Sequence, residues 1–142
     1  LQDSSAASDV YKRQTYDSPS STESIVKEIA DIKQQFTHYG GARPFGVSMM
    51  FAGINGEPSL YVTDVTGNYL QFKANAIGEH DAKIREKLRE SYKDDMSVKD
   101  GLKLALNIFK EVQGDEYSID RFDAGILEMG KPLQKLSGKE LA

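Results

Sequence analysis

Three short apolar segments, separated by two turns, constrain the fold of this chain more than any other feature of its sequence. Residues 44–52 read Pro-Phe-Gly-Val-Ser-Met-Met-Phe-Ala, which is apolar on both alternations and predicts a strand buried on both faces. Further strands are predicted at residues 60–63 and 68–74. The turns between them, at residues 53–56 and 64–67, contain glycine together with asparagine or aspartate. Strands joined by such short turns pair antiparallel.

The third of these strands alternates in polarity, and its drier face is predicted to consist of Leu70, Phe72 and Ala74. A strand buried on both faces requires cover on both sides of the sheet, and helices or a second sheet could supply that cover. Periodicity does not choose between these two arrangements.

A helix is predicted to precede the strands. Ser20 and Glu23 have the spacing of a capping box, so the helix is expected to begin near Ser20, and Gly40-Gly41 is expected to end it. Its apolar stripe is predicted from helical spacing as Ile25, Ile29, Ile32 and Phe36. The remaining, solvated face is predicted to carry Lys27, Glu28, Asp31, Lys33 and Gln34.

Two more helices are expected after the strands, at residues 79–92 and 98–112. Ser97 is placed to cap the second of them, and Asp100 three residues later favours its positive end. A glycine inside a helix costs about 1 kcal/mol of stability relative to alanine. The presence of Gly101 in spite of this cost indicates close packing at this position.

The C-terminal part is predicted to form a last strand at residues 118–128 and a short helix at residues 131–142. The expected order is helix, three strands, two helices, strand and short helix, which is an α+β chain. No internal repeat and no second domain are visible in the sequence.

The first residues differ from the rest in composition, with seven serines among residues 1–24 and little apolar periodicity. The run Asp-Val-Tyr-Lys-Arg-Gln at positions 9–14 resembles a translation of the transposon end used as an adapter in sequencing libraries. We therefore expect residues 1–14 to be a non-native segment and residues 15–142 to be the native part of one domain, with native sequence upstream.

Composition excludes several functions. The chain has no cysteine and two histidines, His38 and His80, which rules out cysteine or multi-histidine metal sites. Its 18 basic and 22 acidic residues argue against a nucleic-acid partner. No stretch approaches the ~20 apolar residues of a membrane-spanning helix, so no membrane partner is expected. The absence of cysteine suits a reducing compartment such as the cytoplasm.

Few residues suggest chemistry. Both histidines are expected at solvated helix ends, and the acidic pairs at 94–95 and 115–116 are expected in turns because they lack the spacing of a calcium loop. The alternating basic run is interleaved with glutamates and predicts a solvated helix face: Lys83, Arg85, Lys87 and Arg89. No catalytic, cofactor-binding or metal-binding residue is predicted.

A family resemblance enters at residues 38–48. The sequence His-Tyr-Gly-Gly-Ala-Arg-Pro-Phe-Gly-Val-Ser closely resembles the signature of α-type subunits of the proteasome core particle. Three further stretches agree with that family in order and spacing, at residues 60–67, 73–78 and 96–102. The resemblance covers about residues 15–136. Residues 77–80, Ile-Gly-Glu-His, lack the Gly-Ser-Gly-like stretch usual in β-type subunits, which favours the α type.

The resemblance implies a four-layer αββα sandwich of the N-terminal-nucleophile hydrolase type, incomplete here because its first strands are missing. It implies a non-catalytic subunit of the seven-membered outer ring, which gates the entry of unfolded substrate. Its partners would be other α-type subunits, β-type subunits and proteasome activators. Catalysis would belong to the N-terminal threonine of β-type subunits. The gating segment and the lysine of the activator pocket have no counterpart in this sequence.

Two other interpretations stay open at the level of sequence. The chain could be part of a β-type or related threonine hydrolase whose nucleophile lies upstream. It could also be a stand-alone α+β binding module with only local similarity, which predicts a folded monomer and no ring. The short tail after Leu136 favours an archaeal over a eukaryotic subunit.

Overall fold

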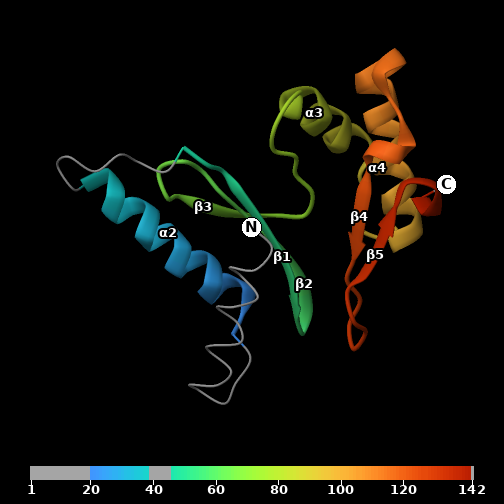
Figure 1. The fold of residues 1–142 in the computed structure, drawn as a ribbon. Coiled ribbons are helices and arrows are strands. Elements are labelled where there is room, and N and C mark those ends of the chain that lie inside the picture. The colour runs from blue at the N-terminus through green and yellow to red at the C-terminus, as the bar shows by residue number, and fades with distance from the viewer. Residues whose placement is uncertain (1–19, 39–45, 142) are drawn as a thin grey trace. The chain divides into compact units, whose positions relative to one another are not determined.

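The computed structural model describes residues 20–38 and 46–141, which fall into two compact units on either side of Phe72 (Figure 1). The described part of the first unit consists of one helix and a three-stranded sheet: α2 (Thr22–His38), β1 (Met49–Asn55), β2 (Glu57–Thr63) and β3 (Tyr69–Phe72). Helix α2 packs across one face of the sheet and contacts all three strands.

The sheet is an antiparallel meander with the strand order β1-β2-β3, which confirms the predicted pairing. Met49 lies opposite Thr63, and Asn55 lies opposite Glu57. The first turn is tighter than predicted, because residues 53–55 continue β1 and only Gly56, with φ 83°, lies between the strands. A positive φ costs glycine nothing, which explains why the chain reverses there.

The burial predicted for the sheet is wrong. In β1 the exposure alternates, and Met50 is 38% exposed, so this strand is not buried on both faces. In β3 the predicted dry face is open, with Leu70 66% and Phe72 36% exposed. The physical reason is that α2 covers only the face that carries Tyr61 and Thr63, and no other described segment of the first unit covers the opposite face.

The stripe predicted for α2 is displaced. The buried residues are Val26, Ala30 and Lys33, whereas Ile32 is 44% exposed. The predicted cap is displaced by one residue: the Ser24 amide donates to the hydroxyl oxygen of Ser21 at 3.1 Å. The predicted helix stop at residues 40–41 lies outside the described residues.

The second unit contains two helices and a two-stranded sheet: α3 (Asp81–Ser91), α4 (Val98–Gln113), β4 (Asp123–Ile126) and β5 (Gln134–Ser137). Short 3-10 turns occupy Gly114–Glu116, Ile119–Arg121 and Gly138–Leu141.

The predicted start of α4 is confirmed. The Ser97 hydroxyl accepts a hydrogen bond from the Asp100 amide at 3.1 Å and donates one to the Asp100 carboxylate at 2.6 Å. The close packing predicted at Gly101 is wrong, because a Cβ atom built there would meet no atom within 4 Å.

The C-terminal part differs most from the prediction. Only residues 123–126 of the expected strand form a β-strand, and the expected helix is replaced by β5 and a 3-10 turn. Strands β4 and β5 pair antiparallel, with Gly125 opposite Lys135. The rings of Tyr117 and Phe109 lie against Phe122, with centroids 5.5 and 5.0 Å away, and so fix the start of this hairpin.

Candidate functional site

The first candidate site is a polar cluster beneath α2 that is built around the ammonium group of Lys33. The side chain is 3% exposed. Its nitrogen donates to the main-chain oxygen of Val47 at 2.6 Å, to the hydroxyl of Thr63 at 2.9 Å and to the main-chain oxygen of Asp64 at 3.1 Å. Lys33 therefore joins three segments: α2, the residues before β1, and the turn after β2.

The electrostatics of this cluster fit a structural role. Burial lowers the pKa of Lys33, and the nearby Asp64 carboxylate partly opposes that effect. An ammonium group has three donors, and all three are used within the protein. The arrangement therefore fits a group that orders the chain.

The turn after β2 is itself ordered by Asp64. One carboxylate oxygen accepts hydrogen bonds from the Thr66 amide at 2.8 Å, the Thr66 hydroxyl at 2.7 Å and the Asn68 amide at 3.0 Å. These bonds lower the pKa of Asp64 to about 2, led by the Thr66 hydroxyl. Carboxylates that cap a turn in this way limit the conformations open to its backbone.

The same turn lies directly against the helix. Gly67 has φ 92°, and a Cβ atom at this position would lie 2.6 Å from the main-chain oxygen of Ala30 and 2.9 Å from the amide of Gln34. Glycine is therefore required twice, for its backbone conformation and for the close approach to α2. Together, Lys33 and Gly67 fix where the turn meets α2.

Sequence reasoning placed Lys33 on the solvated face of its helix, and the structure corrects this. The signal was present in the spacing, since Val26, Ala30 and Lys33 lie at i, i+4 and i+7 on one helix face. In a sequence, a lysine in such a series indicates that the apolar stripe ends there, because charged side chains are rarely buried without partners. Its three acceptors become neighbours only in the fold.

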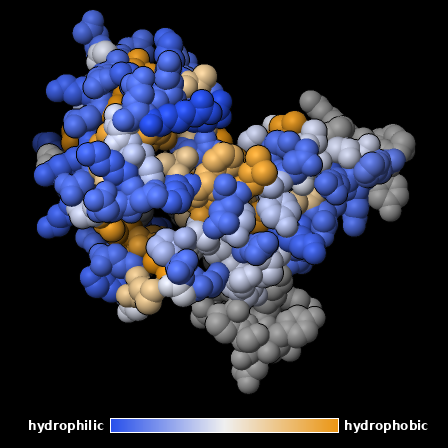
Figure 2. All heavy atoms as spheres, turned by 180° about the vertical axis from the view of Figure 1, so that it is seen from behind, coloured by the Kyte–Doolittle hydropathy of each residue, from blue (hydrophilic) through white to orange (hydrophobic). Residues whose placement is uncertain are grey.

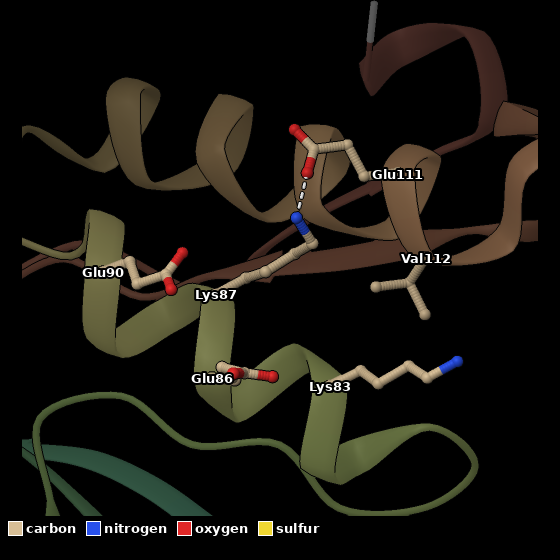
Figure 3. A pocket seen from close by; sticks show the side chains of 6 residues that line it. All are labelled: Lys83, Glu86, Lys87, Glu90, Glu111 and Val112. Atoms are coloured by element: carbon tan, nitrogen blue, oxygen red, sulfur yellow. Dashed lines mark hydrogen bonds and ion pairs between the residues drawn. The ribbon is translucent and has the colours of Figure 1, made fainter.

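The second candidate site is a shallow depression of about 340 Å³ between α3 and α4, shown in Figure 3. It is lined by Lys83, Glu86, Lys87, Glu90, Glu111 and Val112. The Lys87 ammonium group forms an ion pair with the Glu111 carboxylate across the two helices. Positive and negative side chains therefore alternate along the walls of the depression. This arrangement matches neither a phosphate-binding site nor a general acid–base pair.

The basic run predicted as a solvated face is only partly solvated. Lys83 and Arg89 are exposed, whereas Arg85 and Lys87 are half-buried and ion-paired. Arg85 lies 3.0 Å from Asp81, one helical turn earlier.

The histidines lie where the sequence placed them, at helix ends. His38 is the last residue of α2 and is exposed. His80 precedes α3 in a left-handed conformation, with φ 60°, and its ring lies 3.7 Å from Glu79.

The acidic pairs are divided between a loop and a turn. Asp94 forms an ion pair with Lys73, and residues 115–116 lie in a 3-10 turn. Across residues 20–38 and 46–141, no three potential metal-ligating side chains come together. None of the described helices is long and apolar enough to cross a membrane.

The third candidate site is the sheet face opposite α2. Its outward side chains are Met50, Ala52, Ile54, Pro58, Leu60, Val62, Leu70 and Phe72, all of them apolar. The α2 side of the same strands carries Asn55, Glu57 and Gln71, so the uncovered face is the more apolar of the two. Hydrophobic side chains open at the surface are visible in Figure 2. A contiguous apolar face is typical of an interaction surface.

Comparison with known proteins identifies the family to which this chain belongs. A family model described as proteasome subunit matches residues 6–127. The chain belongs to the proteasome subunit family. The family resemblance seen in the sequence is thereby confirmed, and the mixed helices and strands fit an α+β member.

Several relatives are named as α subunits. The chain is 39% identical over 130 residues to the proteasome subunit alpha of Pyrococcus horikoshii, covering 91% of this chain and 50% of the relative. It is 46% identical over 94 residues to that of Archaeoglobus fulgidus, covering 66% and 38%. For proteasome subunit alpha 2 of Haloarcula marismortui the identity is 38% over 142 residues, covering 94% and 58%.

The chain spans about half the length of these curated relatives. Their names support an α-type proteasome subunit, as the sequence signature predicted. The family match begins within residues 1–14, whose structure lies outside the described residues, so the proposed boundary at residue 15 stays a prediction.

Proposed function

We propose that this chain is part of a non-catalytic α-type subunit that forms the outer ring of a proteasome core particle. The observation that carries the proposal is the similarity to α subunits of three archaea, which runs through most of the chain. In this role the subunit is not an enzyme by itself but a component of a threonine-type endopeptidase complex, in which β-type subunits cleave the substrate.

The fold proposed for the complete subunit is a four-layer αββα sandwich. The open sheet face supports it, because Leu70 and Phe72 sit on a surface that only a further layer can remove from water. Helix α2 would be an outer layer on one side. The second sheet would come from the half of the subunit that this chain does not span.

The proposed partners follow from that role. They are other α-type subunits in a seven-membered ring, β-type subunits beneath it, and activators that dock on the outer face. The ring would gate the entry of unfolded proteins and support ubiquitin- or activator-dependent degradation in the cytoplasm. We propose no nucleic acid, membrane, metal or cofactor as a partner.

A chimeric subunit tests this function directly. Residues 20–141 replace the matching residues of the Pyrococcus horikoshii α subunit, which supplies the half that this chain does not span. We expect the chimera to assemble into rings, seen by native mass spectrometry and electron microscopy. When it is combined with β subunits of that organism, we expect degradation of an unfolded protein substrate.

The controls separate the alternatives. The same residues grafted into a β subunit should not yield an active peptidase, and success there would favour a threonine hydrolase. The chain alone should aggregate or stay partly unfolded. A soluble monomer with a cooperative melt, together with a chimera that forms no rings, would overturn the proposal in favour of a stand-alone binding module.

A further inference from the structure

We draw no further inference here: the strongest candidate, the surface patch at Val47 and Val65 beside the Lys33 cluster, is exposed and apolar, but nothing in the structure shows what covers it.

Discussion

The ammonium nitrogen of Lys33 lies 2.9 Å from the hydroxyl oxygen of Thr63, and both side chains are almost fully buried. This contact joins the middle of α2 to the last residue of β2. Main-chain oxygens of Val47 and Asp64 complete the environment of the nitrogen. A single side chain thus connects the helix to two segments at one end of the sheet.

Replacing this lysine should destabilise the fold strongly. Lys33→Met keeps the volume but leaves the buried hydroxyl of Thr63 and two part-buried main-chain carbonyl groups without their donor, and an unsatisfied buried group costs about 1–3 kcal/mol. We expect a loss of about 3 kcal/mol, measured by thermal unfolding of the chimeric subunit. The matched control is Lys27→Met, an exposed position on the same helix, which should change stability by less than about 0.5 kcal/mol. Equal melting temperatures for the two variants would contradict the role of Lys33.

A second prediction concerns the close approach of the turn to the helix. Gly67→Ala places a methyl group against the main chain of Ala30 and Gln34 in addition to straining a positive φ. Gly56→Ala strains a similar φ of 83° but meets no atom within 4 Å. Strain at a left-handed residue costs about 1–2 kcal/mol, so both variants should melt earlier than the parent.

The difference between the two variants isolates the contact with α2. We expect Gly67→Ala to be the less stable of the pair by at least about 1 kcal/mol, since overpacking costs about 1–3 kcal/mol. If Gly56→Ala proved equally damaging, backbone strain alone would account for both, and the turn would not be held against the helix.

The turn should also respond to acid. The pKa of Asp64 falls from 3.8 to about 2 on folding, so the folded state favours the ionised carboxylate. Its contribution to stability is present above pH 3.8 and is lost as the pH falls from 3.8 towards 2. Because the carboxylate is exposed, we expect Asp64→Asn to cost only about 1 kcal/mol at neutral pH.

Urea unfolding midpoints at several pH values between 6 and 2 test this expectation. The gap between Asp64→Asn and the parent should close as the solution is acidified. Asp31→Asn, which removes an exposed carboxylate from α2, serves as the control for general charge effects. A gap that stays constant to pH 2 would show that the hydrogen bonds to Thr66 and Asn68 do not depend on ionisation.

Helix α4 offers a stabilising substitution. Gly101→Ala adds a methyl group in open space within a helix, where alanine is preferred by about 0.5–1 kcal/mol. A rise in melting temperature is therefore expected. Gly114→Ala has equal space but a φ of 55° at the end of α4, so it should lower the melting temperature. A fall for Gly101→Ala in the chimera would reveal a neighbouring segment that packs there.

The open sheet face leads to a prediction about solubility and assembly. In the chain alone, Leu70→Lys should reduce aggregation, followed by light scattering, because it places a charge on the exposed part of the apolar face. In the chimera the same substitution should reduce ring formation, since burying an unpaired charge under a second layer is costly.

Met129→Lys is the matched control, because Met129 is also 66% exposed but lies in the loop between β4 and β5. It adds the same charge at a position that is not part of the sheet, so it should improve the solubility of the lone chain less than Leu70→Lys. A Leu70→Lys chimera that assembled as well as the parent would show that this face stays uncovered in the subunit.

Local sequence determined the elements and their caps in most of the chain. Ser97 and Asp100 begin α4 through contacts only three residues apart, and the turn at residues 64–67 is ordered by Asp64 through neighbours within four residues. Such contacts form between near neighbours in the chain, so spacing and residue type are sufficient to predict them. The family signature was equally readable, because it consists of contiguous segments.

The tertiary structure alone decided which faces are covered. Periodicity shows that α2 and the strands have apolar positions, but both sides of each element carry some, and packing chooses between them. Packing against the sheet buries Val26 and Ala30 and leaves Ile32 exposed. Lys33 is buried as well, because oxygen atoms of residues 14 to 31 positions away accept hydrogen bonds from its nitrogen. The packing also leaves Leu70 exposed, since burial depends on a partner layer rather than on the residue itself.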